Sequence, residues 1–171
     1  MASRERVRTR ELEPTISLYE HFLKHFRDMR AQQNHGRVVS RSEDRDWEST
    51  RQGIMKYYLH PQLIGDTAIQ DWQCFVHKII RHSGKHKHQG GLVIYVLEGK
   101  GYSVVDGERH DWEAGDLLLL PIKPGGVEHQ HFNTDPDTPC RWLAFIHWPT
   151  LDHLASPAEQ LEDSPTWGGR P

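Results

Sequence analysis

Two pairs of histidines, each separated by a single residue, are the feature of this sequence most able to carry chemistry. The pairs are His86 with His88 and His129 with His131, within a chain that holds 13 histidines. In an extended strand, residues two apart point to the same face, so each pair presents two imidazoles side by side. Imidazole nitrogens are good ligands for zinc, copper, iron and nickel. The spacing therefore predicts a metal site, provided that two strands bring the pairs together.

The region beyond residue 53 has the pattern of short strands separated by turns. Apolar runs predict strands over 54–59, 72–82, 85–96, 101–105, 108–112, 117–121, 128–132 and 141–147. Nine of the 14 glycines lie between Gly84 and Gly126, and Asp106-Gly107 is typical of a tight hairpin turn. This pattern favours an all-β antiparallel barrel. The inward-facing strands of a small barrel would bring the two histidine pairs together.

The flanks of this region differ from it in composition and divide the chain into four parts. Residues 1–13 are charged and predict a flexible arm, and residues 14–53 predict an amphipathic helix and a linker, because apolar positions from Ile16 to Met29 recur at helical spacing. Residues 54–149 form the expected barrel. Residues 150–171 are polar and predict a C-terminal tail with one helical turn near 157–161.

Length, charge and cysteine content narrow the class of protein. A chain of 171 residues fits one domain with a helical appendage. Its 21 basic and 24 acidic residues give a net charge of −3, which offers no basic surface for nucleic acid. The longest apolar runs, 92–97 and 117–120, are far shorter than the roughly 20 residues that cross a bilayer. With two cysteines and no secretory signal, we expect a cytoplasmic protein with reduced thiols.

The residues around the histidines resemble the two motifs of the cupin family. The first motif is matched by 84–88 (Gly-Lys-His-Lys-His) and 96–99 (Val-Leu-Glu-Gly), and the second by Gly115-Asp116, Pro124-Gly125-Gly126, His129 and Asn133. The resemblance covers about residues 72–147 and implies a single-domain cupin, a jelly-roll barrel that holds one divalent metal. It carries the family's metal ligands onto His86, His88 and His129. Gly115 stands further from Pro124 than the motif expects, so the second motif contains a small insertion.

One departure from the first motif narrows the chemistry. The position four residues after the second histidine, where the family usually has a glutamate ligand, is Leu92. Because the strand predicted over 85–96 runs from His86 through Leu92, residue 92 shares the inward parity of the histidines. Three neutral imidazoles without a carboxylate leave the full +2 charge on the metal, which favours anionic chelating ligands. This pattern resembles the ring-cleaving dioxygenases of the gentisate and salicylate type, which implies Fe(II), dioxygen and a small aromatic or chelating acid as substrate.

Several roles stay open at this point. His131 shares the inward parity of His129 and is either an acid/base or supporting group of the site or a residue that packs against a strand. Arg81, Arg141 and Lys123 are the nearest candidates for binding an anionic substrate, with a solvated surface position as the alternative for each. His77 and His82 lie on opposite faces of the preceding strand, so that one of them faces the cavity or both are core or rim residues. Two other functions fit the same residues: a lyase or isomerase that uses zinc, nickel or manganese, and a non-enzymatic cupin that senses a ligand. By analogy of fold we also expect a homodimer.

Overall fold

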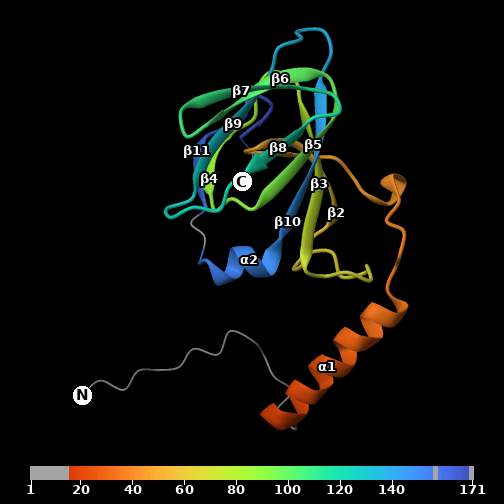
Figure 1. The fold of residues 1–171 in the computed structure, drawn as a ribbon. Coiled ribbons are helices and arrows are strands. Elements are labelled where there is room, and N and C mark those ends of the chain that lie inside the picture. The colour runs from red at the N-terminus through yellow and green to blue at the C-terminus, as the bar shows by residue number, and fades with distance from the viewer. Residues whose placement is uncertain (1–15, 156–157, 170–171) are drawn as a thin grey trace, which may run out of the picture.

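The computed structural model describes residues 16–155 and 158–169 as one β-barrel that carries two helices (Figure 1). The arm expected over residues 1–13 lies outside the described residues. Helix α1 (Leu18–His35) begins at Ser17, whose hydroxyl accepts a hydrogen bond from the Glu20 amide. A 3-10 turn, η1 (Ser42–Asp44), lies in the linker, and helix α2 (Trp148–His153) follows the last long strand. None of the described helices is long and apolar enough to cross a membrane.

Two antiparallel sheets face each other, as a jelly roll requires. The larger sheet has the order β1 (Glu48–Thr50), β2 (Gly53–Leu59), β3 (Trp72–Ile79), β10 (Cys140–His147), β5 (Leu92–Glu98) and β8 (Leu117–Leu120). The smaller sheet has the order β11 (Glu159–Glu162), β4 (Lys85–His88), β9 (Val127–Asn133), β6 (Lys100–Val105) and β7 (Glu108–Glu113). The expected fold class is confirmed: the protein is an all-β jelly roll with an N-terminal amphipathic helix.

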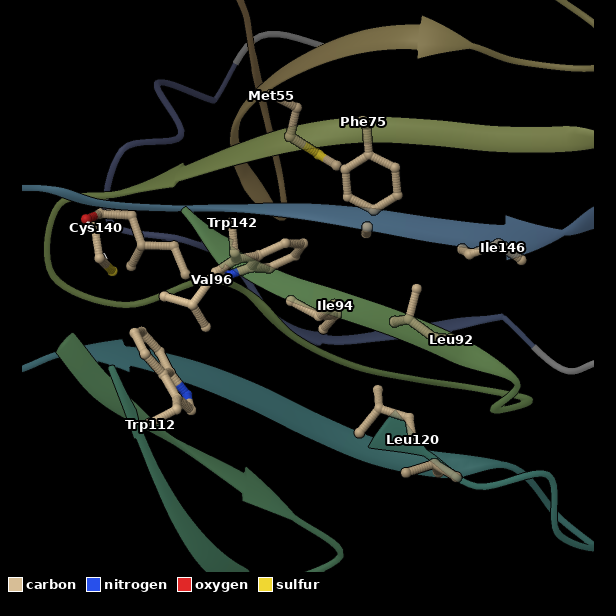
Figure 2. Packing of buried hydrophobic residues seen from close by; sticks show 13 residues of the cluster. Met55, Phe75, Leu92, Ile94, Val96, Trp112, Leu120, Cys140, Trp142 and Ile146 are labelled. Atoms are coloured by element: carbon tan, nitrogen blue, oxygen red, sulfur yellow. Dashed lines mark hydrogen bonds between the residues drawn. The ribbon is translucent and has the colours of Figure 1, made fainter. Parts of the chain in front are cut away.

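The core lies between the two sheets and is packed from the inner faces of alternating strand residues. Trp142 and Ile146 on β10 pack with Ile94 and Val96 on β5, and Trp112 reaches them from the smaller sheet (Figure 2). Figure 2 shows the same side chains pointing into the space between the strands. Burial of this apolar surface is the main favourable term in folding. The core thus holds the two sheets at a fixed separation, and the site is built beside it.

The strand expected over residues 85–96 is wrong as a single element. Gly90 and Gly91 break it into β4 and β5, which belong to different sheets. Gly91 has a φ of +76°, a conformation that residues with a Cβ rarely adopt, and a Cβ on Gly90 would lie 1.7 Å from the Pro121 carbonyl oxygen. The chain therefore crosses between the sheets here, so that His86 and Leu92 face each other from opposite sides of the barrel interior.

Other local expectations have mixed outcomes. The Asp106-Gly107 turn is confirmed, since both residues have positive φ, as a type I′ hairpin between β6 and β7 requires. The helical turn expected near 157–161 is wrong, because residues 159–162 form strand β11, which pairs with β4. Strand β1 in the linker was not predicted. Both missed strands are short and polar, and they gain their hydrogen bonds only from partners distant in sequence.

Candidate metal centre

Pairing between β4 and β9 brings three histidines to one point. In the antiparallel register His86 lies opposite His129, and His88 follows on the same face of β4. The ring centroids of His86 and His129 are 4.2 Å apart, and those of His88 and His129 are 4.8 Å apart. One ring nitrogen from each histidine lies within 4.8 Å of the others. These three side chains can therefore hold one metal ion between them.

Backbone carbonyls orient all three rings in the same way. The Nδ1 atom of His86 lies 3.3 Å from the Gly84 oxygen, that of His88 lies 2.6 Å from the Gln89 oxygen, and that of His129 lies 3.1 Å from the Val127 oxygen. A carbonyl oxygen only accepts, so each Nδ1 carries the proton and donates it. Each Nε2 therefore presents its lone pair, which is the tautomer that a metal ligand needs.

Burial keeps these histidines neutral. Removal from water lowers the pKa of His86 to about 4, with a further contribution from His88. The same cause lowers the pKa of His88, and it lowers that of His129 well below the usual value, where His86, His131 and His88 add to the effect. Neutral imidazole is the form that binds a metal. The three rings are thus ready to bind a metal at neutral pH without first releasing a proton.

The donor set fits a divalent transition metal. The Nε2 atom of His129 is buried and has no hydrogen-bond partner, which is costly for a polar atom unless a ligand satisfies it. No aspartate, glutamate or cysteine joins the three histidines in the only metal-ligating group found among the described residues. Imidazole suits zinc, copper, iron and nickel, whereas calcium and magnesium prefer oxygen ligands. The site therefore selects for a transition metal without choosing among them.

A cavity of about 140 Å³ opens beside the three histidines. Its walls are largely apolar and aromatic, and the described residues that line it, apart from the three histidines, are Gln52, Gln73, Phe75, His77, Leu92, His131, Trp142, Ile146, Trp148, Leu151 and Ala158. An engineered cavity of about 150 Å³ holds one benzene ring. A ligand in this cavity is therefore no larger than a single ring unless the walls move.

Leu92 lines this cavity, as expected, although the physical reason differs from strand parity. It begins β5 in the larger sheet, is buried, and faces the histidines from across the interior. A glutamate here would point into the same cavity from the opposite sheet. Leu92 instead gives the site an apolar wall.

His131 is held differently from the other three histidines. Trp112 donates its indole N–H to the Ser103 hydroxyl at 2.9 Å, and the Ser103 oxygen lies 2.6 Å from Nδ1 of His131. Ser103 is fully buried and Trp112 can only donate, so Nδ1 of His131 is the one acceptor for the Ser103 proton among the described contacts. His131 then carries its proton on Nε2 and lines the cavity as a donor. Burial holds the pKa of His131 well below the usual value, with contributions from His77, His86 and His88, so the ring is neutral.

His77 also lines the cavity, whereas His82 does not. It lies on β3, and burial, together with His86, lowers its pKa to about 3, against the raising effect of a hydrogen bond to the Gln52 backbone. A Cβ at Gly53 would lie 2.2 Å from its Nε2, so only glycine fits there. Sequence reasoning left the choice between His77 and His82 open and missed Gln73 and helix α2. Strand parity around Phe75 was the available signal for Gln73 and His77, and nothing local marked α2.

The structure does not bring the three expected substrate-binding cations to the cavity. Arg141 has the opposite parity to the buried Trp142 and forms an ion pair with Glu98, with its Nε donating to the Glu98 carboxylate at 2.7 Å. Arg81 is exposed in the turn between β3 and β4. Lys123 forms an ion pair with Asp106 at the surface. Among the described lining residues, none carries a positively charged side chain at neutral pH.

Comparison with known proteins agrees with this geometry. Residues 81–146 match the family described as "Cupin domain". The chain is 34% identical over 70 residues, 40% of its length, to a gentisate 1,2-dioxygenase from Ralstonia. It is also 34% identical over 80 residues, 44% of its length, to an acireductone dioxygenase from Phaeosphaeria nodorum. The matched stretches span only 19% and 39% of those two relatives.

Solved structures give the same fold at lower identity. Salicylate 1,2-dioxygenase from Pseudoaminobacter salicylatoxidans matches with a TM-score of 0.50 and 16% identity, over 82% of this chain and 35% of that one. The Streptomyces protein Pac13, described as a nucleoside dehydratase, matches with a TM-score of 0.53 and 10% identity, over 74% of this chain and 93% of that one. Residues 81–146 therefore match the cupin domain, and the solved structures agree with the jelly-roll fold. A 70-residue stretch of the chain is similar in sequence to part of a gentisate 1,2-dioxygenase.

We predict that one divalent metal binds per chain through His86, His88 and His129. The His86→Ala/His88→Ala double variant should lose at least nine-tenths of the bound metal, because two of three donors are gone, and should still fold, because the core lies elsewhere. Elemental analysis and circular dichroism measure the two outcomes. His110→Ala, which removes an exposed histidine on β7, is the matched control and should keep its metal. Undiminished metal in the double variant would contradict the assignment.

We also predict that acid destabilises the metal-free protein. With a pKa of about 4 in the folded state and 6.5 in the unfolded state, His86 takes up a proton mainly on unfolding when the pH falls below 6.5. The contribution of neutral His86 to the free energy of unfolding is therefore fully present above pH 6.5 and decreases toward pH 4. At pH 5 the decrease is about 2 kcal/mol for this one residue. Urea unfolding at pH 7 and pH 5 measures the difference. It should shrink in His86→Gln and persist in His110→Gln; an equal loss in both variants would contradict the prediction.

Proposed function

We propose that this protein is an Fe(II)-dependent dioxygenase that oxidises a small aromatic or otherwise chelating acid bound directly to the metal. The observation that carries the proposal is the set of three neutral histidines, without a carboxylate, at the wall of a small apolar cavity. Two partial relatives named as dioxygenases support it. The fold alone does not, since Pac13 shares the fold and is named as a dehydratase.

The chain's own residues supply a site with no charge of its own. His86, His88 and His129 would hold the iron, which when bound would supply a Lewis-acidic, redox-active centre for the reaction of a chelating acid with dioxygen. Since the histidines are neutral, they leave the +2 charge of the ion uncompensated in a low-dielectric cavity. That charge, rather than an arginine, would attract an anionic substrate. The cavity residues thereby favour a ligand whose two anionic oxygens both reach the metal.

Size and polarity of the cavity restrict the rest of the substrate. The described lining residues offer Leu92, Ile146 and Trp148 as apolar walls, with the amide of Gln73 among the few neutral polar groups. A further carboxylate or phosphate, remote from the metal, would be buried here without a cationic partner, which is costly. We therefore propose a substrate no larger than one ring, with its negative charge confined to the chelating atoms.

His131 completes the proposed site as a hydrogen-bond donor. Its Nδ1 accepts from Ser103, so Nε2–H remains available to a substrate oxygen in the cavity. A donor of this kind stabilises negative charge that develops on that oxygen during reaction. His131 would thus orient the substrate and would not act as a fourth metal ligand, because its Nε2 carries a proton.

Oxygen uptake tests the proposed reaction. Protein loaded anaerobically with Fe(II) should consume dioxygen with at least one member of a panel of salicylate, gentisate, catechol and 1,3-diketones, whereas protein loaded with Zn(II) should not. The His86→Ala/His88→Ala variant is the control for free iron in solution. Turnover of a panel member by the zinc form without dioxygen would contradict the oxygenase proposal and favour a lyase or isomerase.

Leu92→Glu tests whether residue 92 faces the metal. A carboxylate here would stay ionised beside a dication and act as a fourth ligand, so metal content should equal or exceed that of the native protein. Oxygen uptake should fall by about tenfold or more, equivalent to about 1.4 kcal/mol, because the new ligand occupies a position that substrate needs and reduces the net charge. Leu92→Gln is the uncharged control. Native metal content together with native turnover in Leu92→Glu would contradict the placement.

A further inference from the structure

The outer face of the larger sheet carries a broad apolar area over β3, β10, β5 and β8. In the observed register Val93 lies beside Leu119 and Phe145, and Tyr95 lies beside Leu117 and Leu143. These outward side chains form one contiguous patch across four strands, here called the outer patch: Leu117, Leu119, Val93, Tyr95, Leu97, Leu143, Phe145, Cys74 and Val76. Its side on β8 is open, with Leu117 61% and Leu119 63% exposed.

Such a face is unusual for a sheet that meets water. An antiparallel sheet with one solvated face alternates apolar and polar residues, whereas strands covered on both faces are apolar throughout. Residues 92–97 of β5 read Leu-Val-Ile-Tyr-Val-Leu, and all four residues of β8 are leucine. Large contiguous apolar patches on a protein surface mark interaction sites. The strand sequences therefore indicate that the outer patch is covered in the working protein.

Helix α1 carries a second apolar surface that is largely exposed. Tyr19, Phe22, Phe26 and Met29 follow one face of the helix, here called the helix stripe, and the three aromatic rings contact one another in a row. Phe22 is 55% exposed and Phe26 53%, and α1 contains no buried residue. A lone helix of this kind gains little stability from propensity alone and depends on packing of its apolar face.

The attachment of α1 directs it away from its own sheet. Gln32 donates from Nε2 to the backbone oxygens of Gly65, at 2.9 Å, and Thr67, at 3.2 Å. The Arg37 amide then donates to the backbone oxygen of Asp66. A Cβ at Gly36 would lie 2.7 Å from the Ala68 amide nitrogen, so the end of α1 packs closely against residues 66–68. The helix projects from the barrel beyond this anchor (Figure 1). Its stripe therefore does not cover the outer patch of the same chain.

We propose that a second copy of this chain covers the outer patch with its helix stripe, in a reciprocal homodimer. A two-fold axis makes the exchange closed, so that both unpartnered surfaces of both chains are covered at once. A groove of about 490 Å³ continues the outer patch and has room for aromatic side chains. Val76, Leu143 and Phe145 line it from the sheet, and it is bordered by Arg37, Val38, Ser40 and residues 67–69. The outer patch and the helix stripe together contain about ten half-exposed side chains per chain. At roughly 80 Å² each, their accessible area approaches the roughly 800 Å² that each partner buries in a stable interface.

Sedimentation and light scattering of the full chain, with paired variants, test this interface. The native chain should be a dimer at micromolar concentration. Phe22→Glu/Phe26→Glu, which alters only the helix stripe, and Leu119→Glu, which alters only the outer patch, should each weaken dimerisation by a hundredfold or more. Lys24→Gln, on the opposite face of α1, changes the charge by the same amount as one of these substitutions and should remain dimeric. Circular dichroism and bound metal verify that each variant folds.

Mixing the two kinds of variant gives the decisive result. A helix variant paired with a patch variant retains one intact helix on one intact patch, whereas each variant paired with itself retains none. A mixed dimer should therefore form more tightly than either variant alone. A monomeric native chain, a helix variant that remains dimeric, or a mixture that gains nothing would overturn the proposal. These outcomes are independent of metal binding and oxygen uptake.

Discussion

The antiparallel register between β4 and β9 is the constraint on which the candidate site depends. It places His86 opposite His129 and leaves His88 on the same face, and no other described element contributes to the group of three histidines. A shift of this register by one residue would turn one strand's histidines outward, because side chains alternate at every residue. Strand β11 pairs with the other edge of β4, and the Asp106-Gly107 hairpin sets the neighbouring strands. The smaller sheet thus acts as a frame that fixes the positions of the histidines.

The larger sheet supplies the environment rather than the ligands. Its inner face contributes Phe75, Leu92, Trp142 and Ile146 to the cavity wall, and these side chains exclude water from the histidines. The same exclusion lowers the pKa of each histidine and holds the rings neutral. Ligand geometry and ligand protonation therefore have separate origins: one sheet sets the distances and the other sets the dielectric.

Hydrogen bonds give the four neighbouring histidines two different characters. Backbone carbonyls take the Nδ1 protons of His86, His88 and His129, which leaves lone pairs at Nε2. At His131 the Ser103 hydroxyl reverses this pattern, because the buried serine proton has only Nδ1 of His131 as an acceptor among the described contacts. Chemically identical side chains thus become three potential ligands and one donor. The outer partners of the rings, and not the rings themselves, decide which histidine does what.

Local sequence determined a large part of this protein. The two histidine pairs, the glycine-rich turns and the alternating apolar strands predicted the all-β fold and the meeting of the two pairs, because strand parity is a local property. The resemblance to the cupin motifs then narrowed the expected ligands to His86, His88 and His129. Only the tertiary structure decided the rest. The split at Gly90-Gly91 sends β4 and β5 into different sheets, Arg141 turns outward to Glu98, and β11 returns to pair with β4. Each depends on which distant strand becomes a neighbour, and that choice is made by burial and hydrogen bonding across the whole barrel.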